Sequence, residues 1–99
     1  MDHIEQKILQ IIDDNAPRLQ ALAEDIFDHA EQGFHEYRTA KIAADFLREL
    51  GLTPEEGLAV TGVKAAIGQG GPNVALIGEL DGLSCPTHPH ATEQGFAHA

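Results

Sequence analysis

Two carboxylates stand where a hydrophobic run meets a loop rich in histidine. Glu79 and Asp81 follow the apolar residues 75–77 and are separated by one position. Side chains alternate between the two faces of a strand, so this spacing predicts that both carboxylates share a face near the strand's carboxyl end. Open α/β sheets place active sites at such ends, where a carboxylate can bind a metal, orient a metal-binding histidine or act as a base. The spacing fits two solvated surface charges equally, and by itself it leaves both interpretations open.

A second group of potential ligands lies in the following loop, at Cys85, His88 and His90. Thiolate and imidazole are ligand types that zinc prefers. Pro86 and Pro89 stiffen this loop, and ligands so close in sequence seldom wrap one ion, so an exposed polar loop is the favoured interpretation. We do not expect Cys85 to be a nucleophile, because no helix N-terminus follows it to build an oxyanion hole.

Composition limits the partners that the chain can have. Its 99 residues carry 16 acidic and 6 basic side chains, for a formal charge of −10. A polyanion needs a basic patch, so we expect no nucleic acid and no anionic membrane as partner. The single cysteine excludes an internal disulfide. We see no signal peptide and no apolar run long enough to span a bilayer, and we expect a cytoplasmic protein.

The first third of the chain has helical periodicity. Isoleucines at helical spacing predict an amphipathic helix over residues 3–14. Asn15 is suited to cap a second helix that has Pro17 in its first turn and ends near residues 29–30. The break between the two helices is either a loop or a kink, since proline is tolerated in a first turn but not inside a helix.

A third helix is predicted over residues 36–50. Gly51 suits the left-handed position that follows a helix, and Pro54 prevents the helix from continuing. The polar bend before this helix contains Gly33, Glu36 and Thr39. We expect the latter two to cap the helix and Gly33 to supply a positive φ.

The second half of the chain favours strands. Residues 60–67 and 74–81 are apolar and flank a glycine-rich turn, so they predict an antiparallel hairpin. Residues 82–99 are interpreted as loop. The second strand requires cover on both faces, and two strands with three helices barely provide it. The prediction is therefore an α/β fold in which residues 1–99 form the incomplete beginning of a larger domain, with no second domain.

Three stretches together resemble the metal-dependent amidohydrolases of the aminoacylase/carboxypeptidase superfamily, and most closely its aminobenzoyl-glutamate utilization branch. "HAEQGFHEYRTA" is similar to the family's His-Pro-Glu-x-Gly-x-x-Glu-x-x-Thr-Ala segment, with Ala30 in place of the proline. "TGVKAAIGQGGPNVALIGELDGL" resembles its first hairpin, which ends in Gly-Glu-x-Asp-Ala-Leu; here Gly82 replaces the alanine. "GFAHA" resembles the run that leads into a Cys-Gly-His metal motif.

The resemblance implies a fold and a chemistry. The fold is the N-terminal part of a mixed-sheet α/β/α metallopeptidase domain, here with about three helices followed by a hairpin. The activity is hydrolysis of N-acyl amino acids, aminobenzoyl-glutamate and related amides with two divalent metal ions, zinc or manganese. The implied mechanism is metal-assisted hydrolysis, in which a carboxylate takes the proton of a metal-activated water. In the family this base belongs to a Glu-Glu pair further along the chain.

Only a few site residues are carried over by the resemblance. Asp81 matches an aspartate that lies beside the metal site and orients a metal-binding histidine. Glu79 occupies a position where other branches have a ligating histidine, and His98 matches a histidine near the metals. Cys85 aligns with no ligand. The ligands and the base are expected beyond Ala99, so we expect this chain to bind no metal and to be inactive.

Two further expectations complete the prediction. The full-length protein is expected to take a small-molecule amide as substrate and to self-associate as a homo-oligomer, because a sheet edge is left open. The alternative from another functional class is a small acidic binding module without enzymatic activity. Zinc held by Cys85, His88 and His90 would then stabilise it.

Overall fold

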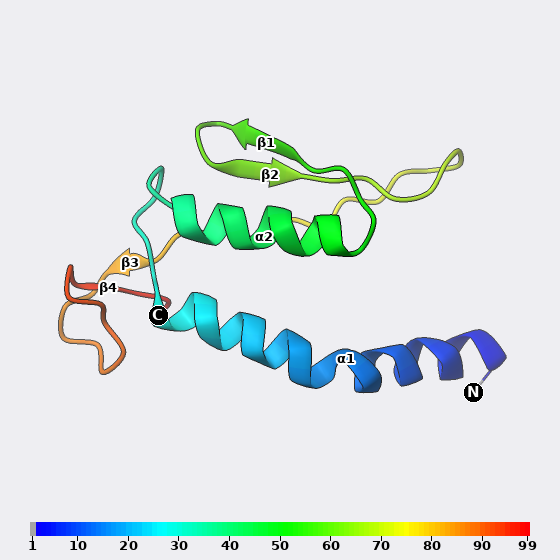
Figure 1. The fold of residues 1–99 in the computed structure, drawn as a ribbon, viewed down its shortest axis with the longest axis horizontal. Helices are drawn as coiled ribbons and strands as arrows, with labels where there is room; N and C mark the ends of the chain where they lie inside the picture. The colour runs from blue at the N-terminus through cyan, green and yellow to red at the C-terminus, as the bar shows by residue number, and fades with distance from the viewer. Residues whose placement is uncertain (1) are drawn as a thin grey trace.

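Two helices and two small antiparallel hairpins make up the fold in the computed structural model, which describes residues 2–99 (Figure 1). In chain order the elements are α1 (His3–Asp28), α2 (Tyr37–Glu49), β1 (Glu55–Leu58), β2 (Gly62–Lys64), β3 (Leu83–Ser84) and β4 (Phe96–Ala97). The β1–β2 hairpin lies along one side of α2, and α1 lies on the other side of that helix. The arrangement agrees with the predicted α/β class.

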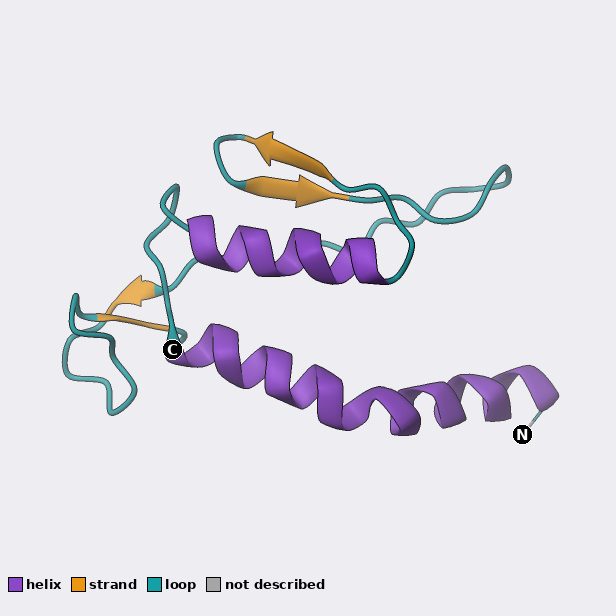
Figure 2. Cartoon of the chain, in the orientation of Figure 1, coloured by secondary structure: helices purple, strands orange, loops and turns teal. Residues whose placement is uncertain are grey.

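The first two predicted helices are one helix, so the predicted cap at Asn15 is wrong. Helix α1 runs continuously through Pro17 and bends partway along its length (Figure 2). Asn15 lies inside the helix, where its side-chain amide donates to the Ile11 carbonyl at 2.8 Å. The helix instead begins after Asp2, whose carboxylate accepts from the Glu5 N–H at 2.8 Å. The kink interpretation of the break is therefore the one that the structure supports.

Helix α2 confirms the third predicted helix almost residue for residue. It spans Tyr37–Glu49, and Gly51 after it has a φ of +86°. A left-handed residue at this position ends a helix at little cost when it is glycine. The local signals at the end of this helix were therefore sufficient to place it.

The bend before α2 differs from the prediction. Glu36 stands at the N-cap position but makes no capping bond with its side chain, and its carboxylate turns toward the β1–β2 hairpin instead. The backbone N–H of Thr39 is bonded by Glu31, which supplies the cap from outside the helix. Phe34, with a φ of 66°, takes the left-handed conformation that we expected at Gly33.

The predicted hairpin between residues 60–67 and 74–81 does not form. Strand β2 covers only part of the first segment, and it pairs antiparallel with β1. The sequence of β1, Glu-Glu-Gly-Leu, lacks the β-branched and aromatic residues that indicate a strand, so it was not predicted. Pairing across the connection at residues 59–61 closes a shorter loop than pairing across the turn at residues 68–73, which favours it by about 0.6 kcal/mol of loop entropy.

Residues 74–81 have strand composition without a strand partner. They form no ladder in the structure, although the adjacent Gly82 makes an isolated parallel bridge with Gln32. Val74, Leu76 and Ile77 are 96%, 101% and 89% exposed. The apolar run is typical of a strand buried on both faces, but the described residues offer it neither a neighbouring strand nor a covering layer.

The segment interpreted as loop contains a second hairpin. Strand β3 pairs antiparallel with β4, with Leu83 opposite Ala97 and Ser84 opposite Phe96. Backbone bonds continue the pairing into the connection, where the Cys85 N–H donates to the Gly95 carbonyl at 2.8 Å. The prediction of loop throughout residues 82–99 is therefore wrong at both ends of that range.

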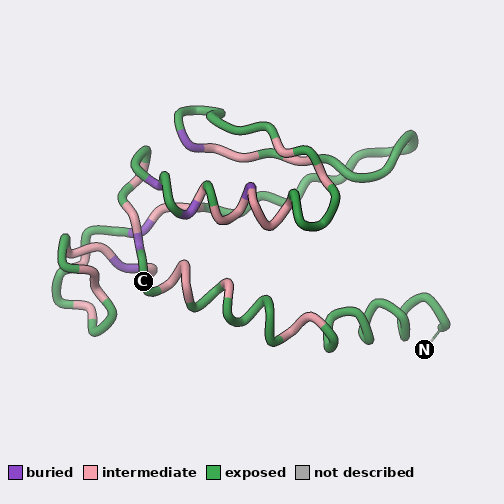
Figure 3. The backbone as a smooth tube through the Cα atoms, viewed as in Figure 1, coloured by how far each residue is buried: buried purple, intermediate pink, exposed green. Residues whose placement is uncertain are grey.

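Few apolar side chains are buried in this fold. The buried apolar residues are three alanines, Ala30, Ala44 and Ala97, and Figure 3 shows how small the buried share of the backbone is. The radius of gyration is 16.0 Å, whereas a compact chain of this length has about 13 Å. The accessible surface is 7741 Å², against about 5,500 Å² for a compact monomer of this mass. No helix in residues 2–99 combines the length and apolar character needed to cross a bilayer.

Three distant segments meet at Gly82, which is buried between them. A Cβ atom built on this glycine would lie 2.9 Å from the Cβ of Ala30 and 3.1 Å from the carbonyl oxygen of Ala97. Both neighbours are themselves buried, and one of the two contacts is with backbone. The segment after α1 and the β3–β4 hairpin therefore approach as closely as they do only because residue 82 has no side chain.

We predict that Gly82→Ala lowers the free energy of unfolding of the chain by about 1 to 3 kcal/mol, because the added methyl group overpacks this junction. Gly78→Ala is the matched control, since a Cβ there meets nothing within 4 Å and the backbone φ is not in the left-handed region. Denaturant unfolding of the two variants beside the parent measures the difference. Equal stability of both variants would contradict the close approach.

Candidate functional site

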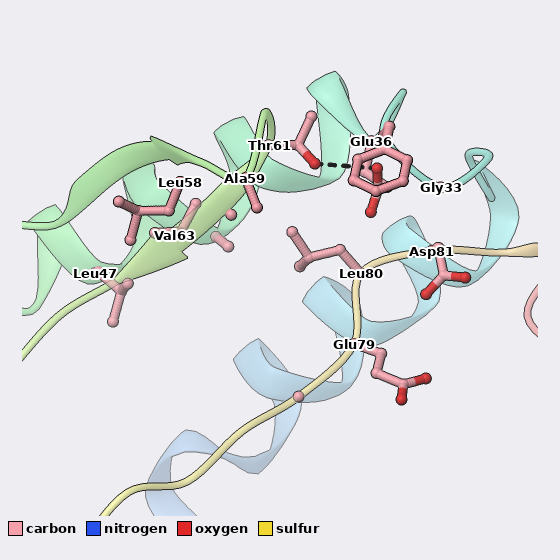
Figure 4. Close-up of a pocket in the computed structure, with 14 residues that line it drawn as sticks. Gly33, Glu36, Leu47, Leu58, Ala59, Thr61, Val63, Glu79, Leu80 and Asp81 are labelled. Atoms are coloured by element: carbon pink, nitrogen blue, oxygen red, sulfur yellow. Dashed lines mark hydrogen bonds between the residues drawn. The ribbon is translucent and has the colours of Figure 1, made fainter.

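An open cavity of about 590 Å³ lies between α2, the β1–β2 hairpin and residues 78–81 (Figure 4). Apolar side chains form most of its wall: Phe34, Ala43, Leu47, Leu58, Ala59, Val63 and Leu80. Glu36, Glu79 and Asp81 are also among the residues that line it. The cavity wall therefore includes the two acidic residues singled out in the sequence and a third that was considered only as a helix cap.

Glu36 is the most deeply buried of these carboxylates, with 8% of its surface exposed. Its Oε1 accepts a hydrogen bond of 3.0 Å from the hydroxyl of Thr61, which is also buried (Figure 4). Thr61 belongs to the turn between β1 and β2, so the bond ties that hairpin to the N-terminus of α2. A buried hydroxyl–carboxylate bond of this kind is costly to break, and its first role is structural.

Glu79 and Asp81 point to the same side of the chain, as their spacing predicts. Figure 4 shows both carboxylates directed away from Leu80, whose side chain points toward the β1–β2 hairpin. Their surroundings differ, because Glu79 is exposed whereas Asp81 is half-buried and lies against Gly33. The two residues thus share a face although the segment that carries them is not part of a sheet.

Asp81 is also better anchored than Glu79. The next residue, Gly82, donates its N–H to the Glu31 carbonyl at 2.6 Å and bridges Gln32 in parallel. These contacts attach Asp81 to the bend that precedes α2. Sequence reasoning missed Glu31 as a contributor to the site. The signal that pointed to it was its place in the "HAEQGFHEYRTA" segment.

His98 lies apart from this cavity. It follows β4, is half-buried and is not among the residues that line the cavity wall. Its Nε2 atom is buried and has no hydrogen-bond partner among residues 2–99. His98 follows Ala97, whose carbonyl lies against Gly82, the residue after Asp81, so the two residues flank the same junction although His98 does not line the cavity.

His88 and His90, in the loop between β3 and β4, lie against the Phe27 ring of α1. The ring centroids of His88 and His90 lie 6.5 Å and 5.0 Å from that of Phe27, and 5.9 Å from each other. The backbone N–H of His90 donates to Nδ1 of His88 at 3.0 Å, which uses one of the two nitrogens that a metal could bind. Cys85 is half-buried, and its thiol is free.

The described residues do not by themselves form a metal site. No group of three or more histidine, cysteine, aspartate or glutamate side chains within residues 2–99 is arranged so that it could hold a metal ion. Zinc and similar ions need at least three protein ligands in the sites that proteins build for them. Neither the carboxylates at the cavity nor the set of Cys85, His88 and His90 therefore fits such an ion without further ligands.

Two curated proteins resemble this chain over most of its length. It is 35% identical over 85 residues to a subunit of the p-aminobenzoyl-glutamate hydrolase of Escherichia coli (strain K12), a match that covers 80% of this chain and 18% of that protein. It is 35% identical over 71 residues to IAA-amino acid hydrolase ILR1-like 6 of Arabidopsis thaliana, a match that covers 71% of this chain and 15% of that protein. No family model and no solved structure matches the chain.

The chain is similar to parts of two amidohydrolases. This confirms the resemblance read from the three sequence stretches. The chain spans less than a fifth of the length of either of these hydrolases.

Ion pairs hold helices α1 and α2 beside each other. At one end of α2, the Arg38 guanidinium contacts the Asp25 carboxylate of α1 at 2.8 Å. At the other end, Arg18 of α1 pairs with Glu49 and stacks 4.6 Å from the centroid of the Phe46 ring. The hydrogen bond from Arg38, with smaller effects of the charges on Arg38 and His29, holds the pKa of Asp25 below its ordinary value of 3.8.

We predict that Arg38→Ala raises the pKa of Asp25 toward 3.8, because the charged form of the carboxylate loses its main hydrogen-bond donor. A depressed pKa contributes stability that is complete above 3.8 and is lost as the pH falls through the lowered value of the folded state. Titration of the Asp25 carboxyl carbon by NMR measures the shift. Arg48→Ala is the control, since Arg48 pairs with Asp45 and Glu56. The same Asp25 pKa in both variants would refute the assignment.

Proposed function

We propose that this chain is part of the catalytic domain of a longer hydrolase that cleaves the amide bonds of N-acyl amino acids or aminobenzoyl-glutamate-like substrates. The observation that carries the proposal is the 35% identity to two hydrolases, shared over 80% and 71% of the chain. The names of both relatives describe the hydrolysis of a compound that contains an amino acid. The open fold supports the proposal, because a segment of a larger domain leaves its contact surfaces uncovered.

The residues at the cavity have distinct roles in this proposal. Asp81 would form part of one wall of the substrate site and orient a group supplied by another segment. Glu79, which is exposed on the same side, would line the entrance and contribute less. His98 does not line the cavity, but it follows Ala97, which packs against Gly82, so it would lie beside the site at the Asp81 end.

A metal requirement is also proposed for the longer protein. Two divalent ions, zinc or manganese, would supply Lewis-acid activation of a water molecule when bound. Because residues 2–99 contain no group of ligands that fits an ion, those ligands and the general base would have to come from other segments. What this chain offers is the positioned carboxylate of Asp81 and the apolar wall beside it.

We predict that the 99-residue chain alone releases no glutamate from aminobenzoyl-glutamate, because residues 2–99 assemble neither a metal site nor a base beside one. The measurement is product release by the purified chain with added zinc or manganese, compared with buffer. Turnover that a chelator abolishes and the metal restores would show that the prediction is wrong.

In the longer protein, Asp81→Ala is predicted to lower kcat/KM for amide hydrolysis by about 10- to 100-fold, the usual effect of removing a group that orients a ligand. Asp13→Ala is the control, since it removes an exposed aspartate from α1 that is not part of the cavity wall. The kcat/KM of Glu79→Ala is expected to lie between the values of the Asp81→Ala and Asp13→Ala variants. Activity of the Asp81 variant equal to that of the control would remove Asp81 from the site.

A further inference from the structure

We propose that Glu31 is a positioning residue, which fixes Asp81 relative to helix α2 through its side chain and its backbone at once. The effect on a reaction rests on the function proposed above, whereas the mechanical link does not. Glu31 stands in the bend between the two helices and lines no part of the cavity. It would therefore act through Asp81 and not by touching a substrate.

The side chain of Glu31 holds the first turn of α2. One carboxylate oxygen accepts from the Arg38 N–H at 3.0 Å, and the other accepts from the Thr39 N–H at 2.6 Å. The first N–H groups of a helix have no partner within the helix, and a negative charge is favourable at that end. Because the N-cap residue Glu36 makes no side-chain cap, this pair of bonds is the side-chain cap that α2 has.

The backbone of Glu31 holds the segment that carries Asp81. Its carbonyl accepts from the Gly82 N–H at 2.6 Å, directly after Asp81. The bridge between Gln32 and Gly82 continues the contact, and a Cβ on Gly33 would lie 3.9 Å from the Cβ of Asp81. One residue thus receives hydrogen bonds from α2 on its side chain and from the Asp81 segment on its main chain.

This link matters because the residues before Asp81 give it little support. Residues 74–81 form no ladder and are largely exposed, so the segment is fixed at Gly82, by its packing against Ala30 and Ala97 and by its hydrogen bond to Glu31. A catalytic group displaced by about 1 Å can cost up to about 100-fold in rate. A loose α2 cap would release Glu31, and with it the one point at which the carboxylate segment is fixed to a helix.

Amide hydrogen exchange on the 99-residue chain tests the link without any activity. In Glu31→Ala we expect the protection of the Gly82 amide to fall by about tenfold or more, together with that of Arg38 and Thr39. Gln32→Ala is the matched control, because it changes the neighbouring side chain and keeps the backbone bridge. Gly82 protection that is equal in the two variants would overturn the proposal.

If Glu31→Ala unfolds the chain, the amides of α1 lose their protection as well. Glu31→Gln then tests whether the Glu31 side chain holds the Asp81 segment. Glutamine keeps one acceptor oxygen and presents an amide to the second N–H, so it can satisfy only one of the two donors. Selective loss of protection at Gly82, Arg38 and Thr39 with α1 unchanged supports the link. Equal loss across α1 and these amides, or no loss at Gly82, overturns it.

Kinetics of the longer protein test the consequence for the reaction. We expect Glu31→Gln to lower kcat by about tenfold with KM nearly unchanged, and to add little to the loss caused by Asp81→Ala, because both variants disable the same group. If the loss of kcat in the double variant equals the product of the two single losses, Glu31 does not act through Asp81 and the positioning role is overturned. If the longer protein cleaves no amide at all, the proposed function fails, and the exchange result still decides whether Glu31 holds Asp81.

Discussion

The fold depends on the close packing of three segments around Gly82. The residue lies against Ala30 after α1, against Ala97 in β4 and against the Glu31 carbonyl in the bend before α2. Two of these neighbours are among the three buried apolar residues. Because the contact consists of backbone and methyl groups, it is specific in distance, but it removes little apolar surface from water.

That constraint explains why the structure is ordered locally and open overall. Capping bonds, ion pairs and short hairpins fix each element against its neighbour, as the Arg38–Asp25 and Thr61–Glu36 contacts illustrate. Burial, which supplies most of the stability of a compact domain, contributes little here. Exposed ion pairs add little stability, so they mainly set the arrangement of α1 and α2. The apolar run at residues 74–77 and the apolar side chains in the first half of α1 are surfaces that this arrangement leaves exposed.

The parts of the fold that could be predicted from the sequence are those that local signals determine. The position of α2 followed from its periodicity and from Gly51, and the shared face of Glu79 and Asp81 followed from their spacing. Strand pairing could not be predicted, because composition shows that a segment suits a sheet without showing which segment lies beside it. The cap of α2 was missed for a similar reason. Glu31 lies six positions before Tyr37, outside the window in which a capping residue is sought.

Local contacts also distinguish Glu79 from Asp81, although their spacing in the sequence makes the two carboxylates equivalent. Asp81 is half-buried and precedes Gly82, whose N–H is bonded to the carbonyl of the helix-capping residue Glu31. Glu79 is exposed on a stretch without ladder contacts, and its position is set by Asp81 and by the packing of Leu80 toward the hairpin. A carboxylate that must orient another group has to be held within a fraction of an ångström. Of the two, Asp81 is the one whose segment is anchored by contacts inside this chain, which is why the positioning role is assigned to it and to the glutamate that bonds to its neighbour.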